Sequence, residues 1–387
     1  MKIAVPRQSR DGETRVALVP QVIKRLVGAG LEVLVEAGAG HGSSISDEAC
    51  RQAGARVVGG AGSVAADLWT QADVVLVVQP PQLDQAGLLK PGAVLAGLLS
   101  PLTNPQLVRV LQERGVTAFA MEFLPRISRA QSMDVLSSQA NLAGYKAVIL
   151  AADHCPKIFP MMMTAAGTLA PARVFVLGAG VAGLQAIATA VRLGAVVEAY
   201  DVRPATREQV QSLGARFVEL PLTTQQTQTA GGYAHELSEE QKRQQAQLMA
   251  KHVIGADAVI TTAAVFGKAP PMLIPADVAA QMSPGSVIVD LAADPHAERG
   301  NCQLTRPGQV YTFDGAAGGV TIIGTLNLPR LVPVHASFAF ANNMQAFLKE
   351  IVAEGQVRLN LEDEIQNGAC IVHEGQVRNE LVQRTLT

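Results

Sequence analysis

The stretch Val174-Phe175-Val176-Leu177-Gly178-Ala179-Gly180-Val181-Ala182-Gly183 decides the fold. An apolar strand runs directly into the pattern G-x-G-x-x-G, and a helical pattern follows it through Leu193 and ends at Gly194. In such a turn the first glycine permits the tight bend, the second lets the backbone approach a pyrophosphate, and the third lets helix and strand pack closely. Alone the pattern is weak, because glycine turns between strands and helices are common.

The next strand supplies the context that the glycine pattern needs. Val196 to Tyr200 is a largely apolar strand that ends at Asp201, where a ribose-binding carboxylate is expected. Such a carboxylate accepts hydrogen bonds from a ribose 2′-OH and repels a 2′-phosphate, which favours NAD over NADP. The alternatives are a solvated or helix-capping Asp201, and an Arg203 that pairs with a 2′-phosphate. The pattern predicts nucleotide contacts at Gly178, Gly180, Val181, Ala182, Gly183, Asp201, Val202 and Arg203.

Two further segments are candidates for the same crevice. Thr261-Thr262-Ala263-Ala264 follows a strand at its carboxyl end, where open α/β sheets bind ligands, so Thr262 and Ala264 are predicted contacts. Gly231-Gly232-Tyr233 lies in a long polar loop, and Gly232 and Tyr233 are candidates for a hinged flap over the nucleotide. A flexible surface loop with a partly exposed tyrosine is an equal alternative.

Apolar runs alternate with helical patterns along the whole chain, which is typical of parallel α/β layers. The expected strands are 3–5, 32–35, 74–78, 94–99 and 117–121, then 174–177, 196–200, 217–219, 258–262, 287–291 and 320–323. Runs without alternation indicate sheets that are covered on both faces. We therefore expect two Rossmann-like, doubly wound parallel-sheet domains, 1–137 plus 327–387 and 138–326, the first being discontinuous.

Three helical segments define this organisation. Ser137 to Leu150 is expected to be a long helix that connects the domains rigidly. His335 to Glu354 has no strand partner of its own, so it is expected to cross back to the first domain. Leu361 to Thr387 is expected to form a short helix and a hairpin around Glu374-Gly375.

Composition excludes several classes of function. The net charge is −2 with interspersed signs, so no basic stripe is offered to nucleic acid. The four cysteines form no C-x-x-C pair, which argues against a metal site or a disulfide framework and favours a reducing compartment. Met1 to Pro6 is expected to be a first strand and not a signal peptide. The apolar stretch Ile158 to Ala170 is interrupted by Pro160 and Gly167, so any membrane span must come from other chains.

A second motif lies between the strand 117–121 and the connecting helix. It is dense in hydrogen-bonding groups and is here called the polar segment: Pro125-Arg126-Ile127-Ser128-Arg129-Ala130-Gln131-Ser132-Met133-Asp134-Val135-Leu136-Ser137-Ser138-Gln139-Ala140-Asn141. By composition alone it could be an ordinary connecting loop with a helix cap at Ser137 or Ser138.

The polar segment, continuing into Leu142-Ala143-Gly144-Tyr145, resembles the loop of the NAD(H)-binding domain I of proton-translocating NAD(P) transhydrogenases, in the alanine dehydrogenase/transhydrogenase family. The resemblance runs nearly end to end and includes segments 164–167, 178–183, 208–215, 231–234 and 284–293. One departure is the longer stretch Asp294 to Arg299 before Gly300-Asn301-Cys302, where the family usually has a Gly-Gly-Asn-Cys turn.

The resemblance implies roles for individual residues. The nicotinamide and its ribose would be held by Arg126, Ile127, Ser128, Arg129, Gln131, Asp134 and Ser137. Arg126 would reach the carboxamide, and Gln131 would lean toward the nucleotide of a neighbouring domain. Asp201 and Arg203 would match the adenosine-ribose pair, and Tyr233 the closing loop. We expect Arg126, Gln131, Asp134 and Ser137 to carry the reaction.

The resemblance also implies an assembly. The chain would be a homodimeric NAD(H)-binding subunit, working with NADP(H) on the NADP-binding domain of a beta subunit and with membrane-spanning subunits. It would be cytoplasmic and peripheral to the inner membrane. A hydride that moves between two nicotinamides leaves no proton to manage, so the reacting atoms need only be brought to roughly 3–3.5 Å in the right orientation.

Two other functions compete with this one. An alanine-dehydrogenase-type amino-acid oxidoreductase needs a proton-transferring lysine and histidine, which that family places after two strands of the first domain. Here those strand ends read Val78-Gln79-Pro80 and Leu99-Ser100-Pro101, and the histidines are scattered. A non-catalytic NAD-sensing module would keep the glycine turn and Asp201 but would not need the polar segment.

Overall fold

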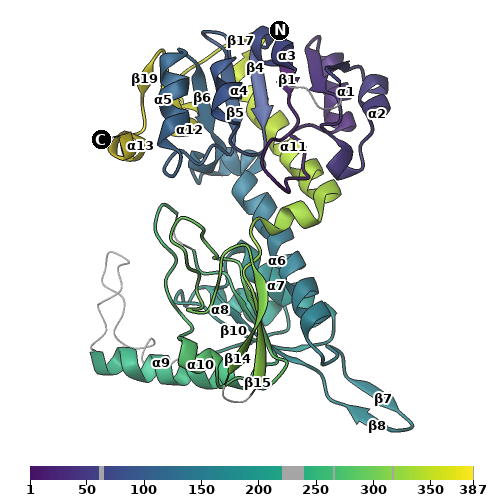
Figure 1. The fold of residues 1–387 in the computed structure, drawn as a ribbon, viewed down its shortest axis with the longest axis vertical. Coiled ribbons are helices and arrows are strands. Elements are labelled where there is room, and N and C mark those ends of the chain that lie inside the picture. The colour runs from purple at the N-terminus through teal and green to yellow at the C-terminus, as the bar shows by residue number, and fades with distance from the viewer. Residues whose placement is uncertain (61–64, 220–238, 265, 316–317, 387) are drawn as a thin grey trace. The chain divides into compact units, whose positions relative to one another are not determined.

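The structure is a computed structural model that describes residues 1–60, 65–219, 239–264, 266–315 and 318–386. It divides into two units. Unit 1 comprises Met1–Gln139 and Pro329–Thr387, and unit 2 comprises Ala140–Leu328. The divisions thus fall after residues 139 and 328, beside the expected boundaries after 137 and 326. Each unit is built around one large sheet (Figure 1).

The sheet of unit 1 has eight strands in the order β19-β18-β6-β5-β4-β1-β2-β3. Its parallel strands are β1 (Lys2–Val5), β2 (Glu32–Glu36), β3 (Arg56–Val58), β4 (Val74–Val77), β5 (Val94–Gly97) and β6 (Thr117–Ala120). The antiparallel edge is the expected terminal hairpin, β18 (Cys370–His373) and β19 (Gln376–Val377). The prediction of a doubly wound parallel sheet is confirmed.

Helices cover both faces of this sheet. One face packs on α1 (Pro20–Gly28), α2 (Asp47–Gln52), α11 (Pro333–Ile351) and α12 (Glu364–Ala369). The other packs on α3 (Ala66–Gln71), α4 (Leu83–Gly87), α5 (Pro105–Glu113) and α13 (Glu380–Leu386). Four short 3-10 turns are η1 (His41–Ser43), η2 (Met121–Phe123), η3 (Ser128–Met133) and η4 (Leu328–Leu331), and β16 (Val352–Ala353) and β17 (Gln356–Val357) form a small hairpin.

Helix α11 returns to unit 1, as the sequence predicts. Its apolar side chains Phe340, Phe347 and Ile351 are completely buried in the core of that unit, and the ring of Phe347 packs edge-on against Phe119 at 5.1 Å between centroids. Unit 1 itself covers this apolar face, so the helix gives no reason to expect cover from a second copy of the chain.

The sheet of unit 2 has seven strands in the order β11-β10-β9-β12-β13-β15-β14. The parallel strands are β9 (Arg173–Leu177), β10 (Val196–Tyr200), β11 (Arg216–Phe217), β12 (Ala258–Thr261), β13 (Val287–Asp290) and β15 (Gly318–Ile323). Strand β14 (Val310–Gly315), which sequence reasoning missed, pairs antiparallel with β15. One face packs on α6 (Val135–His154), α7 (Val181–Arg192) and α8 (Thr206–Ser212), the other on α9 (Glu239–Ile254) and α10 (Ala276–Ala279).

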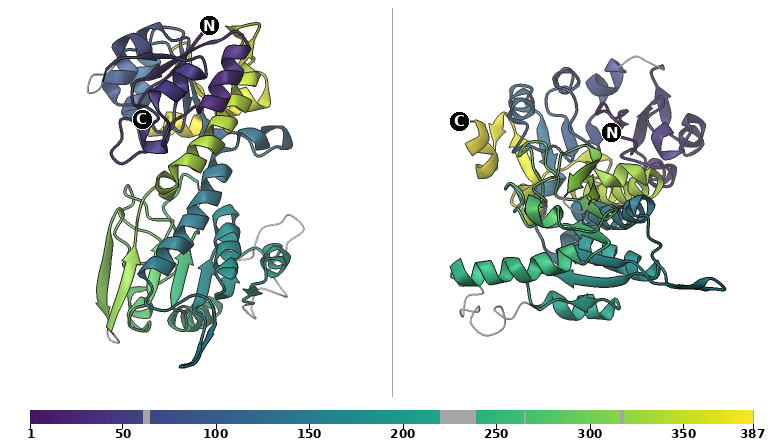
Figure 2. Two further views of the ribbon diagram at one scale, coloured as in Figure 1. Left: turned by 90° about the vertical axis from the view of Figure 1, so that its right-hand side faces the viewer. Right: turned by 60° about the horizontal axis from the view of Figure 1, so that its bottom comes forward.

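A two-stranded hairpin projects from unit 2 (Figures 1 and 2). It consists of β7 (Met162–Thr164) and β8 (Gly167–Leu169), and every residue in it is exposed, Met163 by 79%. The sequence indicates only that this apolar stretch is too interrupted to span a membrane. Among the described residues, no helix combines the length and the hydropathy that a membrane span requires.

Candidate functional site

The glycine turn of unit 2 joins β9 to α7, and packing explains two of its three glycines. Gly178 has a φ of +99°, and a Cβ there would lie 2.5 Å from Oγ1 of Thr262. A Cβ on Gly183 would lie 1.8 Å from the carbonyl oxygen of Gly178. Both positions therefore exclude any side chain for reasons internal to the protein.

Gly180 differs from the other two glycines. The nearest atom to a Cβ built on it is NH2 of Arg203, at 4.0 Å, so no contact within the described residues requires glycine there. The open space lies at the start of α7, whose first N–H groups have no partner within the helix and carry the positive end of its dipole. An open glycine at a helix N-terminus fits the phosphates of a dinucleotide.

This difference predicts opposite effects for two alanine substitutions. Gly183→Ala should destabilise unit 2 by about 1–3 kcal/mol, because the new methyl overlaps the backbone of Gly178. Gly180→Ala should leave the free energy of unfolding nearly unchanged yet weaken dinucleotide binding about tenfold or more, because it blocks close backbone approach. Urea unfolding and fluorescence titration would measure the two quantities. A Gly180→Ala chain with parental nucleotide affinity would contradict the phosphate assignment.

Asp201 lies directly after β10 and is 8% exposed. Its carboxylate accepts four hydrogen bonds: from the N–H of Ala179 at 2.7 Å, from the N–H of Arg203 at 2.8 Å, and from Nε and NH2 of Arg203 at 2.9 Å each. Burial alone would raise the pKa of Asp201, but the hydrogen bonds from Arg203 and Ala179 outweigh it and hold the pKa below its usual value. Asp201 is therefore an anion at the edge of the glycine turn.

The same contacts define what Arg203 does. Its guanidinium binds Asp201 with two parallel N–H groups, although the side chain is 60% exposed. An arginine engaged in this way is not free for a 2′-phosphate, whereas its outer edge still faces solvent. Val202, between the two, is exposed.

The strand end after β12 is fixed from within the unit. Thr262 donates from its hydroxyl to the carbonyl of Gly178 at 3.0 Å. The next residue, Ala263, has both its N–H and its carbonyl bonded to the side chain of Asn301, at 3.0 and 2.8 Å. Thr262 therefore supports the glycine turn, while Ala264 is exposed beside it.

Sequence reasoning missed two residues that support this edge. Asn301 is completely buried, and Asp290 at the end of β13 is also buried. Asp290 accepts hydrogen bonds from the hydroxyls of Thr261 and Thr305, at 2.9 and 2.6 Å. A polar residue that ends a continuous apolar strand, as Asp201 does, was the signal that could have found Asp290.

The longer stretch 294–299 forms a closed turn of its own. The N–H of Asp294 donates to the carbonyl of Arg299 at 2.8 Å, and the N–H of Arg299 donates back at 3.2 Å. Because this bridge closes before Gly300, Asn301 and Cys302 keep their contacts with Ala263 and Asp290. The extra residues are thus accommodated without displacing the strand end.

The polar segment of unit 1 alternates between anchors and exposed side chains. In η3, Ala130 and Met133 are buried in the core, at 2% and 3% exposure. The candidate residues Arg126, Ser128 and Gln131 are exposed, and Ile127 packs partly against the core. The short turn therefore presents Gln131 to solvent from a fixed base.

Asp134 and Ser137 bind each other at the start of α6. Oδ1 of Asp134 accepts the N–H of Ser137 at 2.9 Å, and Oδ2 accepts its hydroxyl at 2.6 Å. Asp134 therefore caps the helix, which begins at Val135, and the expectation of a cap at Ser137 or Ser138 is wrong. The cap lies earlier because the side chain of Asp134 accepts the free N–H of Ser137 in the first turn.

Other candidates in these segments have different surroundings. Arg129 forms an ion pair with Asp363, the cap of α12, so its charge is engaged within unit 1. Gly232 and Tyr233 lie outside the described residues. Within the ranges that the structure describes, no group of histidine, cysteine or acidic side chains has the arrangement of a metal site.

Unit 1 has an acidic residue, Glu36, at the position equivalent to Asp201 of unit 2, but it lacks the glycines. In unit 1, Val35 pairs with the last residue of β1, and Glu36 follows Val35. In unit 2, Tyr200 pairs with the last residue of β9, and Asp201 follows Tyr200. Oε2 of Glu36 accepts the N–H of Arg7 at 2.8 Å. Pro6 stands where unit 2 has Gly178, and proline can neither adopt a positive φ nor donate an N–H. Unit 1 therefore keeps the bond from the acid to the backbone after the first strand, but it offers no dinucleotide turn after β1.

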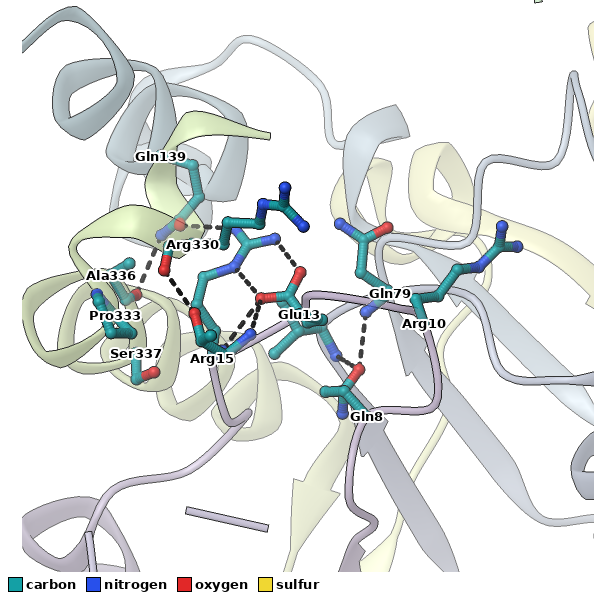
Figure 3. A network of polar contacts seen from close by, with 12 residues as sticks. Gln8, Arg10, Glu13, Arg15, Gln79, Gln139, Arg330, Pro333, Ala336 and Ser337 are labelled. Carbon is teal, nitrogen blue, oxygen red and sulfur yellow. Dashed lines mark hydrogen bonds and ion pairs between the residues drawn. The ribbon is translucent and has the colours of Figure 1, made fainter. Parts of the chain in front are cut away.

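A buried network fills the region beside β1 and β4 in unit 1 (Figure 3). Arg15 binds both oxygens of Glu13 through Nε and NH2, at 2.8 and 2.7 Å, and both side chains are about 1% exposed. NH1 of Arg15 donates to Gln139 at 2.8 Å. Oε1 of Gln8 accepts the backbone N–H groups of Val78 and Gln79, at 3.0 Å each. The guanidinium of Arg15 is thus bound to groups of the protein itself.

Comparisons with known proteins match the whole chain. Residues 4–143 match the family model described as alanine dehydrogenase/PNT, N-terminal domain, and residues 147–380 match its C-terminal domain. The chain is 50% identical over 385 residues to the first part of the NAD(P) transhydrogenase alpha subunit of Rhodospirillum rubrum, covering 97% of each. It is 29% identical to the alanine dehydrogenase of Mycobacterium tuberculosis, covering 92% of this chain and 88% of that one.

A solved structure gives the same result. The crystal structure of transhydrogenase from Sinorhizobium meliloti superposes with a TM-score of 0.83 at 42% identity, covering 98% of this chain and 99% of that one. The predicted fold class and family resemblance are both confirmed.

Proposed function

The chain belongs to the alanine dehydrogenase/PNT family, and on this basis we propose that it is the NAD(H)-binding subunit of a proton-translocating NAD(P) transhydrogenase. Hydride passes directly between NAD(H) on this chain and NADP(H) on the NADP-binding domain of a beta subunit. Separate membrane-spanning subunits carry the coupled protons. The chain is active only with these partners, and it is cytoplasmic and peripheral to the inner membrane through them.

The observation that carries the proposal is the chemistry of the strand ends in unit 1. An amino-acid dehydrogenase must move protons and hold a substrate carboxylate. Gln79 and Ser100 occupy the positions of the expected lysine and histidine, and neither side chain serves as a base near neutral pH. The paired N–H groups of Arg15 are bound to Glu13, so they are not open to a substrate carboxylate. These features favour hydride exchange over the alanine-dehydrogenase alternative.

A non-catalytic NAD-sensing module is the remaining alternative. Such a module needs the glycine turn and Asp201 but has no use for the exposed Gln131 on an anchored turn. The 50% identity to a named transhydrogenase subunit, against 29% to an alanine dehydrogenase, also supports the catalytic interpretation.

The residues of the chain divide the work as follows. NAD(H), when bound, supplies or accepts the hydride. The start of α7 with Gly180 holds the phosphates, and Asp201 holds the adenosine ribose. Arg126 holds the carboxamide, Asp134 and Ser137 fix the loop at the nicotinamide ribose, and Gln131 faces the nucleotide of the partner domain. The remaining proposed contacts with NAD(H) are Ile127, Ser128, Arg129, Thr262, Ala264, Gly232 and Tyr233.

The decisive experiment is a comparison of two assays. The chain mixed with its NADP-binding partner domain should reduce an NAD analogue at the expense of NADPH. The chain alone should not reduce NAD with alanine or another amino acid. Amino-acid-dependent reduction by the lone chain would overturn the proposal.

We also propose that the chain is a homodimer, with the projecting hairpin as part of the contact. Met162, Met163 and Leu169 on the hairpin are 46%, 79% and 47% exposed, and such apolar surface is uncommon on a monomer. Replacing Met163 and Leu169 by glutamate should therefore convert the dimer to a monomer, because buried charge opposes association.

Light scattering at micromolar concentration measures the outcome as a halved mass. Met272→Glu is the control, since Met272 is 54% exposed in unit 2 but lies outside the hairpin. A parental chain that is monomeric under these conditions would contradict the homodimer.

A further inference from the structure

Helix α11 carries two polar residues on its buried face, Ser337 and Asn343. Their neighbours on that face include Phe340, Met344 and Phe347, all completely buried. A polar side chain in such surroundings is costly unless its hydrogen bonds are satisfied. Both residues have partners, and those partners lie in other parts of unit 1.

Asn343 bonds to two points of the polar segment. Its Nδ2 donates to the backbone carbonyl of Ser132 at 2.8 Å, and its Oδ1 accepts the hydroxyl of Ser138 at 2.7 Å. Asn343 itself is 8% exposed. One amide group, more than 200 residues away in the sequence, thus joins the end of η3 to the first turn of α6.

The stretch enclosed by these two bonds contains or adjoins three of the proposed reaction residues. Gln131 directly precedes Ser132, and Asp134 and Ser137 lie between Ser132 and Ser138. The bonds between Asp134 and Ser137 form a local cap that an isolated helix start would also provide. The bonds to Asn343 tie this local cap to the core of the unit.

A second line of contacts holds the same helix turn. Gln139, next to Ser138, donates through Nε2 to the carbonyl of Ala336 on α11 at 3.1 Å and accepts from Arg15 (Figure 3). Ser337 accepts the N–H of Val16 at 3.0 Å. The bond from Gln139 fixes α6 to α11 one residue beyond Ser138, and the bond from Val16 holds α11 to the segment before α1. The amide of Asn343 instead reaches back to the η3 side of the polar segment.

We propose that Asn343 is a positioning residue, whose amide holds Ser132 and Ser138 together and thereby sets the place of Gln131, Asp134 and Ser137 during hydride transfer. The proposal rests on the proposed function for its catalytic consequence. Asn343 touches neither nucleotide; it acts through the backbone of Ser132 and the hydroxyl of Ser138.

The test substitutes Asn343→Ala in the full chain, with Asn342→Ala as the matched control. Asn342 is the adjacent asparagine on α11 but is turned to the surface, where its amide donates to the carbonyl of Phe338 at 2.8 Å. Three quantities are measured: the rate of hydride transfer with the NADP-binding partner domain, the dissociation constant of NADH, and amide hydrogen exchange along residues 128–140.

Asn343→Ala should slow hydride transfer by about tenfold to a hundredfold, because small displacements of reacting groups cost rates of that order. The dissociation constant of NADH should change by less than about threefold, since the proposed phosphate and adenosine contacts are untouched. Amide exchange should accelerate between residues 131 and 138 and stay parental in α7. Asn342→Ala should match the parent in all three.

A residue that only stabilised the fold would lower thermal stability without separating rate from affinity. Parental transfer and parental exchange in Asn343→Ala would overturn the proposal. If the parental chain itself transfers no hydride with its partner, the proposed function fails. The amide exchange of residues 131–138 in Asn343→Ala then decides alone whether Asn343 holds this stretch in place. If Asn343→Ala does not fold, Ser138→Ala decides: it removes the bond to Oδ1 of Asn343, together with the longer contacts of the same hydroxyl with the Val135 carbonyl and with Nε2 of Gln139, and it leaves the bond to Ser132 in place. Parental transfer and parental exchange in Ser138→Ala would then overturn the proposal.

Discussion

Asp201→Asn should reverse or abolish the preference of the chain for NADH over NADPH. The asparagine keeps the shape of the side chain and one acceptor oxygen, so the N–H of Ala179 can still be satisfied. The negative charge, however, is lost, and Arg203 loses the ionic partner that its Nε and NH2 bind in the parent.

Two effects add in the same direction. A neutral acceptor binds the ribose hydroxyl more weakly than a carboxylate, which should raise the dissociation constant of NADH about tenfold. Removing the carboxylate also removes the repulsion of a 2′-phosphate, and the released Arg203, already 60% exposed, can pair with it. The ratio of the two dissociation constants should therefore shift by about a hundredfold.

Equilibrium titration followed by nucleotide fluorescence measures both constants. Glu198→Gln is the matched control, because Glu198 lies on the same strand and is also ion-paired, to Arg216. It should leave the preference unchanged. Equal affinities of the parental chain for NADH and NADPH would remove the basis for assigning Asp201 to the adenosine ribose.

The sequence predicted the parallel strands well where each is a continuous apolar run. Strands such as β4 (Val74–Val77) and β13 (Val287–Asp290) are buried on both faces, so their composition alone identifies them. It missed β3, β14 and the projecting hairpin of β7 and β8. In these strands the side chains are largely exposed or alternate in burial, so the apolar run that marks a covered strand is absent.

The residues of the candidate site likewise fall into those that the sequence predicted and those that it did not. The turn made by the glycines and the place of Asp201 beside it were predictable, because both follow from a local sequence of strand, turn and helix; their nucleotide contacts stay a prediction. Asn301 and Asn343 were not, because each supports the site through partners that are distant in the sequence. Asn343 lies three residues after Phe340 and four before Phe347, on the apolar face of the helix, but its partners Ser132 and Ser138 become apparent only once the helix is packed.

The two acids at the ends of the second strands show why a motif must be interpreted together with its flanks. Glu36 and Asp201 have the same register and the same bond to the residue two after the first strand. Around Asp201 the backbone has glycines and a helix that begins at once; around Glu36 it has Pro6, and α1 begins only at Pro20. The acid alone therefore ties a loop, and the glycine turn with its helix is what distinguishes the site at which we propose that a nucleotide binds.

Gln131→Asn should slow hydride transfer on the order of a hundredfold while leaving NADH affinity nearly unchanged. Gln131 is exposed on η3, between the buried anchors Ala130 and Met133, so shortening its side chain should not disturb the turn. What changes is the reach of its amide by one methylene. If that amide meets the nucleotide of the partner domain, the loss falls on the step in which both nucleotides are present.

The chain itself gives the reason to expect a partner at this point. Unit 1 has no glycine turn after its first strand, so in the proposed reaction we expect NADP(H) to be held by another protein. The assay therefore mixes the chain with the NADP-binding partner domain and follows the reduction of an NAD analogue by NADPH, with NADH titration of the chain alone beside it. Gln106→Asn, on the exposed face of α5, is the control for the chemical change itself. Transfer at the parental rate by Gln131→Asn would show that this residue takes no part in the reaction. A loss of NADH affinity that parallels the loss of rate would instead assign Gln131 to NADH binding within this chain. The reason is that an interaction made with the partner's nucleotide cannot contribute when that nucleotide is absent.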